Sequence, residues 1–155
     1  MLLRPPDQAS ASGRTTSIGT SVLLSRPVLW GVIWGFINAA APVIVWWLPA
    51  ATVLAMTIPL IAAVYIGFAV SDGRPKVIAV ETCVAGAFFI LAAFAVNSVW
   101  LLPVLFIGHG GKDLWQHRTQ FVRGTRWWPP FCATVDFVVA AVLFVEIAAG
   151  VQLHG

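Results

Sequence analysis

Residues 50–70 read AATVLAMTIPLIAAVYIGFAV, a run that contains no charged side chain. An α-helix rises about 1.5 Å per residue, so a run of this length reaches about 30 Å, the thickness of the hydrocarbon core of a bilayer. A chain in hydrocarbon must satisfy its own backbone N–H and C=O groups, which a helix does within one segment. The sequence therefore predicts a transmembrane helix here.

Three further segments resemble this run in composition, and a fourth, residues 99–117, is purely apolar only over residues 99–107. Hydrophobic residues make up 59% of the 155 residues and charged residues only 10%, which excludes an ordinary soluble domain of this size. We therefore expect an all-α fold, a polytopic membrane protein with a bundle of five transmembrane helices. The predicted spans are residues 28–47, 50–70, 77–96, 99–117 and 130–151, which form one domain over residues 28–151.

The positive charges predict the orientation of this bundle. The Lys and Arg residues, nine in all, fall in three clusters, which are Arg4, Arg14 and Arg26, then Arg74 and Lys76, then Lys112, Arg118, Arg123 and Arg126. If all five segments cross, every one of these cations lies on the cytoplasmic side. If residues 99–117 only re-enter the membrane, the third cluster moves outside and the bias is lost. The charges therefore favour five crossings, with the N-terminus cytoplasmic and the C-terminus outside.

Residues 1–27 differ from the rest of the chain. They hold prolines and a Ser/Thr/Gly-rich run with too little apolar content to bury, so we predict a disordered cytoplasmic arm. The net charge of +3 does not indicate nucleic-acid binding, because the cations flank the apolar segments and no basic face carries interleaved aromatic residues. The expected partner is the lipid bilayer.

Small and aromatic residues predict how the helices pack and where they meet the membrane surface. Gly31 and Gly35 are four residues apart, which permits close helix packing; we favour packing within the chain, and a homo-oligomer stays open. Trp127 and Trp128 are interpreted as an interfacial anchor in preference to a substrate clamp.

Ionisable residues inside the predicted spans are few, and such residues are costly and commonly functional. On the fourth predicted helix three of them recur every four residues, along one slowly drifting face. Counted from the cytoplasmic helix ends at about 1.5 Å per residue, the carboxylates lie roughly 6 to 10 Å deep and share a level. The polar residues of this predicted site are Glu81, His109, Asp113, His117, Cys132 and Asp136.

One hypothesis for this site is a metal centre. His109, Asp113 and His117 are the candidate ligands, because neutral imidazole and carboxylate groups suit Zn, Fe or Mn. The cofactor is unknown from the sequence, with a divalent metal as the candidate.

Other hypotheses need no metal. In acid–base catalysis a desolvated carboxyl group would exchange a proton with a lipophilic substrate, with a histidine as its partner. The same groups also fit a structural network with Lys112 and Arg118, or a path for protons or ions. The candidate catalytic residues are Asp113, Asp136, His109 and Glu81.

The last third of the chain carries a recognisable pattern. GHGGKDLWQH at residues 108–117, then WPPFC at residues 128–132 and Asp136, resembles a family of small uncharacterised bacterial integral membrane proteins that share a domain of unknown function. The positions that fit the pattern are His109, Asp113, His117, Cys132 and Asp136. Gln116 and Lys112 depart from it, since the family pattern has His and Trp there. The resemblance implies a bacterial inner membrane protein with a shared site and names no reaction.

Three classes of function remain open from the sequence. The leading hypothesis is a small membrane enzyme or enzyme accessory that acts on an isoprenoid or lipid in a pocket near the cytoplasmic leaflet. The second is a proton-coupled or ion transporter subunit, which would require an oligomer because five spans give no inverted repeat. The third is a non-catalytic membrane scaffold.

Overall fold

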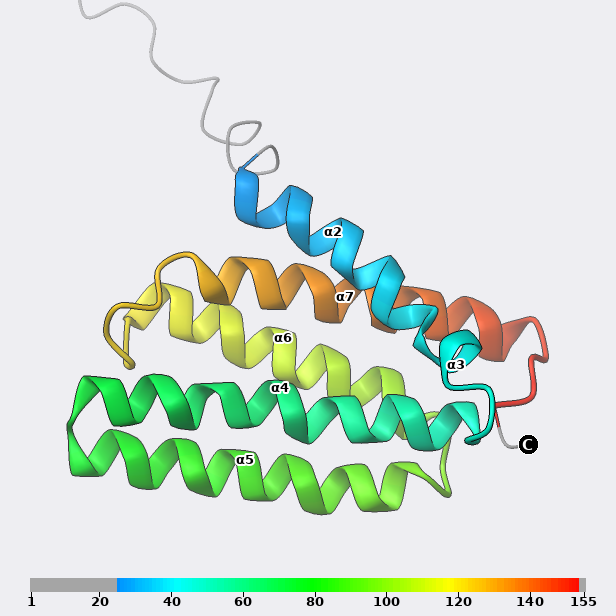
Figure 1. The fold of residues 1–155 in the computed structure, drawn as a ribbon, viewed down its shortest axis with the longest axis horizontal. Helices are drawn as coiled ribbons and strands as arrows, with labels where there is room; N and C mark the ends of the chain where they lie inside the picture. Colours follow the sequence, from blue (N-terminus) through cyan, green and yellow to red (C-terminus); the bar gives the residue numbers. More distant parts are fainter. Residues whose placement is uncertain (1–24, 154–155) are drawn as a thin grey trace, which may run out of the picture.

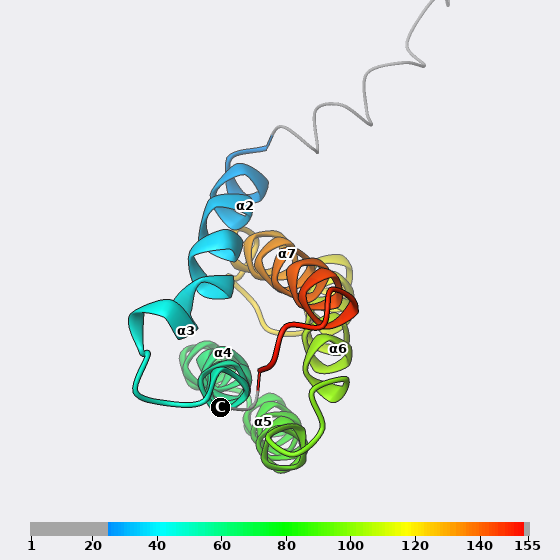
Figure 2. The same ribbon diagram turned by 90° about the vertical axis from the view of Figure 1, so that its right-hand side faces the viewer.

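A computed structural model of the chain describes residues 25–153, and every regular element in this range is an α-helix. Figure 1 shows α4, α5, α6 and α7 side by side, with α2 lying across α7. Figure 2 shows the same four helices around a common core, with α2 outside α7. The helices are α2 (Arg26–Ala39), α3 (Ala41–Ile44), α4 (Ala50–Asp72), α5 (Pro75–Ala95), α6 (Leu101–Thr119) and α7 (Trp128–Ala148).

Among the described residues, α4, α5 and α7 are long and apolar enough to cross a membrane. They correspond to the predicted spans 50–70, 77–96 and 130–151, and their ends agree with the prediction to within a few residues. The predicted all-α class is confirmed, and these helices are compatible with a multi-pass membrane protein.

The predicted helix over residues 28–47 is wrong as one continuous element. Helix α2 ends at Ala39, and after Ala40 the short α3 begins. Pro42, in the first turn of α3, has no N–H to donate to the preceding turn, and its ring would clash with the carbonyl one turn earlier in a continuous helix. The break at Ala40 follows from this proline.

The predicted N-terminal arm overlaps the described part of the chain only at its end. Arg26 and Pro27 begin α2, with the proline in the first turn, where a missing N–H donor costs least. Arg26 and Pro27 therefore belong to a helix and not to a disordered arm, and residues 1–24 of the predicted arm lie outside the described residues.

Helix α2 packs on α7 through the two predicted small residues. A Cβ atom built on Gly31 would lie 2.6 Å from the Cβ of Thr134, and one built on Gly35 would lie 2.6 Å from the Cβ of Val138. Real side chains do not approach so closely, so only glycine permits this separation of the two helices. The preference for packing within the chain is confirmed.

The two loops at one end of the bundle are joined by an arginine and an aspartate. Helix α4 ends at Gly73, whose φ of +77° is left-handed. Arg74 donates to the Asp72 carboxylate and to the carbonyl oxygen of Phe121, and the same carboxylate accepts from the backbone N–H of Arg123. The hydrogen bond to Asp72 raises the pKa of the Arg74 guanidinium above its ordinary value. These contacts hold the α4–α5 turn against the α6–α7 loop.

The bundle is chemically asymmetric along its length. The segments that link helices at the opposite end, residues 39–50, 95–101 and 148–153, contain no Lys or Arg. Figure 1 shows that this end holds the α3–α4 link and the last described residues. There the backbone N–H of Ala51 donates to the carbonyl oxygen of Leu153. All described cations except Lys112 lie on loops or helix ends at the other end of the bundle. The described cations are Arg26, Arg74, Lys76, Lys112, Arg118, Arg123 and Arg126.

Candidate functional site

Helices α6 and α7 bring three ionisable side chains together in the core. His109 and Asp113 lie one turn apart on α6, and Asp136 lies on α7. The helices approach closely there because Gly110 has no side chain: a Cβ atom at this position would lie 3.3 Å from the Cβ of Asp136 and 3.1 Å from the Phe137 ring. The sequence predicted all three residues for one polar site, and the structure brings them into contact.

The three side chains of this cluster lie close together and are shielded from solvent. The Nδ1 atom of His109 lies 2.8 Å from an Asp136 carboxylate oxygen and 3.5 Å from an Asp113 carboxylate oxygen. All three side chains are at most 1% exposed. One ligand atom from each residue lies within 4.8 Å of the others. We call these three residues the His109 cluster.

The His109 cluster has more hydrogen-bonding atoms than partners. The imidazole Nδ1 satisfies one oxygen of Asp136. Both carboxylate oxygens of Asp113, the second oxygen of Asp136 and the Nε2 atom of His109 have no hydrogen-bond partner within residues 25–153. Buried polar groups are normally paired, because an unpaired one loses its hydration without compensation.

Glu81 and Lys112 form an ion pair next to the His109 cluster. The Lys112 ammonium lies 2.7 Å from a Glu81 carboxylate oxygen and 3.1 Å from the centre of the Tyr65 ring. A cation over an aromatic face is stabilised by the ring quadrupole. Glu81, a predicted catalytic residue, therefore has a cation as its partner and is not part of the His109 cluster. The predicted structural network is present for Lys112, while Arg118 is exposed.

His117, a predicted metal ligand, lies outside the His109 cluster because it is exposed on the surface of α6. Each step of four residues overshoots a full helical turn by about 40°, so two steps from His109 turn the side chain about 80° away. The neighbouring residue Gln116 faces inward instead. Its amide donates to the carbonyl oxygen of Val122 and to the Thr125 hydroxyl, and it accepts from the Val122 N–H. Gln116 is a loop anchor that sequence spacing did not identify.

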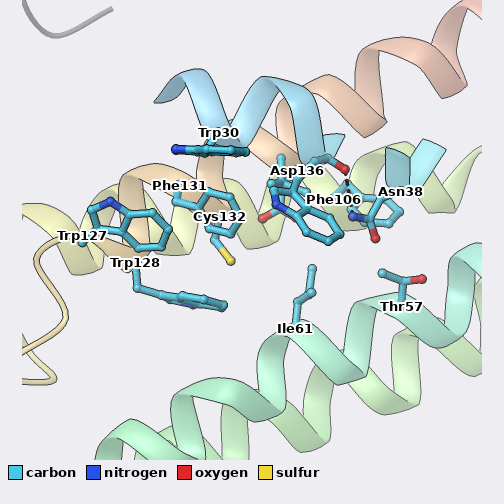
Figure 3. A pocket seen from close by; sticks show the side chains of 12 residues that line it. Trp30, Asn38, Thr57, Ile61, Phe106, Trp127, Trp128, Phe131, Cys132 and Asp136 are labelled. Carbon is cyan, nitrogen blue, oxygen red and sulfur yellow. Dashed lines mark hydrogen bonds between the residues drawn. The ribbon is translucent and has the colours of Figure 1, made fainter. Parts of the chain in front are cut away.

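A largely apolar cavity of about 490 Å³ lies beside the His109 cluster, between α2, α4, α6 and α7. Figure 3 shows side chains from α2 and α7 on one side of this cavity, with Ile61 and Thr57 of α4 facing them. Asp136 and the buried Cys132 contribute its polar groups on α7. The residues that line this aromatic pocket are Trp30, Trp34, Asn38, Thr57, Ile61, Phe106, Trp127, Trp128, Phe131, Cys132, Val135 and Asp136.

The tryptophans of the aromatic pocket were predicted as membrane-surface anchors. Trp127 stacks on Phe131 with ring centres 4.9 Å apart, and Trp128 packs edge to face with Phe68. An indole at a helix end suits both roles, so composition did not distinguish them. The pairing of Trp30 with Trp127 and Trp128 around one cavity depends on α2 packing across α7, which the sequence does not specify.

The site thus combines an apolar cavity with buried acid, imidazole and thiol groups. A carboxylate hydrogen-bonded to an imidazole can hold or move a proton, and two carboxylates with an imidazole can bind a divalent metal. Comparisons with protein-family models, with curated proteins and with solved structures give no match to this chain.

Proposed function

We propose that the protein crosses a membrane five times, in the inner membrane of a bacterium, with its N-terminus cytoplasmic and its C-terminus outside. The one-sided distribution of the described cations supports this orientation, because positive loops stay in the cytoplasm. The resemblance of the last third of the chain to a family of bacterial integral membrane proteins supports the location.

Helix α6 supports a fourth crossing even though it is too polar to be recognised from composition. Its apolar residues Val104, Ile107, Leu114 and Trp115 are exposed, while three polar residues before its last turn are buried, which are His109, Asp113 and Gln116. A soluble protein has the opposite arrangement, whereas a helix in lipid keeps its ionisable groups on the bundle interior. Helix α2, with α3 and the turn that follows, would supply the fifth crossing.

We further propose that the protein binds an isoprenoid or lipid chain in the aromatic pocket and that the His109 cluster acts on its polar end. In this proposal the protein is a membrane enzyme or an enzyme accessory. The observation that carries the proposal is that Asp136 belongs to both parts: it lines the pocket and shares a 2.8 Å hydrogen bond with His109.

The chemistry follows from what each group can reach. The pocket wall is almost entirely apolar and aromatic, which suits a hydrocarbon chain and excludes water from the reacting end. Asp136 is the acidic group on that wall, so it is the group that would exchange a proton with a substrate oxygen. His109 would orient the carboxylate and share the proton, as acid–base partners do when they lie within hydrogen-bond reach.

The pocket can be tested by mass spectrometry of the lipophilic molecules that co-purify with the full-length protein. Ile61→Trp fills the cavity from α4, and Leu60→Trp introduces the same side chain at the neighbouring position, which faces outward and is 67% exposed. We expect wild type and Leu60→Trp to retain a bound lipophilic molecule and Ile61→Trp to lose it. Equal retention in the two variants, or no bound molecule in wild type, would overturn the proposal.

The role of Asp136 is tested in the same preparation. Asp136→Asn preserves the shape of the side chain and removes its ability to take up a proton. We expect this variant to hold the same chain with an unprocessed polar end, seen as a change in the mass of the bound molecule. An identical mass in wild type and Asp136→Asn would contradict the acid–base role.

A further inference from the structure

The His109 cluster would carry a net negative charge with both of its carboxyl groups ionised, and no described cation forms an ion pair with either of them. It holds two carboxyl groups, of Asp113 and Asp136, and one imidazole, all with at most 1% exposure. The nearest buried cation, Lys112, is already paired with Glu81 at 2.7 Å. Two carboxylates and a neutral imidazole together have a charge of −2, and an unbalanced charge of this size is costly in a buried site.

We propose that His109, Asp113 and Asp136 bind one divalent transition metal ion. The ion would neutralise the charge of the two carboxylates. An imidazole with two carboxylates is a donor set that suits Zn, Fe or Mn. This inference concerns the polar end of the same site: the ion would replace the hydrogen bond between His109 and Asp136, and metal binding does not depend on what occupies the pocket.

The distances within the cluster fit an ion of this kind. Metal–nitrogen and metal–oxygen bonds of about 2.0–2.2 Å separate neighbouring ligand atoms by about 2.8–3.6 Å in tetrahedral or octahedral geometry. The separations of 2.8 and 3.5 Å from His109 Nδ1 to the oxygens of Asp136 and Asp113 fall in this range. Because ligand atoms from all three residues lie within 4.8 Å of one another, a small rotation of one carboxylate completes the site.

The hydrogen-bond deficit of the cluster points to the same ligand. Asp113 is fully buried, and the Tyr65 hydroxyl lies beside it without forming a hydrogen bond of normal length and angle. A hydrogen bond from His109 accounts for Asp136 and leaves Asp113 without one. A metal ion would bond to both carboxylates at once and would also explain why Lys112, the residue next to Asp113, is directed to Glu81 instead.

Three protein ligands leave coordination positions for a water molecule or for an oxygen of the substrate. The Tyr65 hydroxyl is buried without a partner within residues 25–153, and the Tyr65 ring packs edge to face with the His109 imidazole at 6.3 Å. This hydroxyl lies beside Asp113 and would be placed to donate to a metal-bound water. The Asp136 ligand connects the metal to the aromatic pocket.

The test measures metal uptake by the full-length protein, purified without a histidine tag and stripped with a chelator. Cobalt(II) is the probe, because its visible absorption reports its coordination geometry and mass spectrometry of the eluted protein counts the ions per chain. We expect one cobalt ion per chain in wild type. Asp113→Asn and Asp136→Asn, which keep the side-chain shape, should each lower the affinity by at least about tenfold.

Two control variants make the result specific. His117→Gln removes an exposed histidine outside the cluster and should bind cobalt as wild type does. Ile61→Trp should lose the lipophilic molecule and keep the metal, so a failure of one proposal is distinguishable from a failure of the other. Wild-type protein that elutes folded but without cobalt would overturn the inference, as would equal uptake by wild type and both asparagine variants, or loss of uptake in His117→Gln.

Discussion

Two adjacent residues of α6, Lys112 and Asp113, belong to two buried polar groups that differ in their balance of cationic and acidic side chains. Lys112 extends toward α5 and pairs with Glu81, so each charge has a partner of the other sign. Asp113 extends toward α7, where it joins His109 and Asp136 in a group with an excess of carboxylates. The first group is balanced within the protein, and the second is not.

The difference distinguishes a structural role from a functional one. A balanced buried pair needs nothing else, although both members are required once the charges are buried. A cluster with unpaired carboxylate oxygens is less stable than it could be, and proteins retain such features mainly at sites that act on a ligand. Stability measurements on the two groups should therefore give opposite results.

The largest effect is expected for Lys112→Met, which leaves the Glu81 carboxylate buried without its cation. The free energy of unfolding should fall by about 3 kcal/mol, because an uncompensated buried charge costs more than the pair it came from. Titration of the micelle-bound protein with sodium dodecyl sulfate, followed by circular dichroism, measures this value.

The double variant Glu81→Met, Lys112→Met is the matched control. It removes both charges with side chains of similar length, so stability should return to within about 1 kcal/mol of wild type. A double variant as unstable as Lys112→Met would mean that the pair contributes through packing and that its charge balance is not what matters.

The next effect concerns the contact between α2 and α7, which borders the aromatic pocket and lies outside both polar groups. Gly35→Ala adds a Cβ atom 2.6 Å from the Cβ of Val138, so the helices must separate at a cost of about 2 kcal/mol. The bound lipophilic molecule should be lost while cobalt uptake remains. Thermal unfolding, lipid mass spectrometry and cobalt counting on one preparation test all three outcomes.

Gly108→Ala is the control for this substitution, because a Cβ atom there meets nothing within 4 Å among the described residues. Alanine is the better helix former, so this variant should be as stable as wild type or about 0.5 kcal/mol more stable. If Gly108→Ala and Gly35→Ala behave alike, the close approach of α2 and α7 does not determine the pocket.

Most of the helical structure was predictable from the sequence because lipid imposes simple constraints. The predicted spans 50–70, 77–96 and 130–151 correspond to α4, α5 and α7, because each is a long apolar run bounded by residues that favour turns. The span 28–47 failed at Pro42, although the residue that breaks it was visible in the sequence. The apolar composition continues through Pro42, so composition alone predicts one continuous helix there.

The residues of the site were predictable from spacing and depth, but their partners were not. Spacing by four found His109 and Asp113, which share a face of α6. Counting depth from the helix ends placed Asp136 at the same level, while its contact with His109 depends on the register of α6 against α7, which Gly110 allows and the sequence does not state. For the same reason, spacing could not show that Glu81 pairs with Lys112 or that His117 turns outward.

Gln116 provides an intermediate case on the same helix, a buried polar side chain that is neutral and fully hydrogen-bonded. Gln116→Ala removes its bonds to Val122 and Thr125, so the free energy of unfolding should fall by about 1.5 kcal/mol. The exposed neighbour Arg118→Ala should change it by less than about 0.5 kcal/mol. A smaller loss for Gln116→Ala than for Arg118→Ala, measured by the same detergent titration, would refute the loop-anchor role.

The smallest change in stability is expected for Asp113→Asn, and its sign matters more than its size. The substitution removes one of two carboxylates from a buried group that lacks cations, so the metal-free protein should become more stable, by up to about 1 kcal/mol. The measurement is made in chelator, because a bound ion would stabilise the wild type and reverse the sign. Adding cobalt should then stabilise wild type and leave Asp113→Asn unchanged. A loss of about 3 kcal/mol in chelator, like that expected for Lys112→Met, would mean that the two polar groups of α6 have the same structural role.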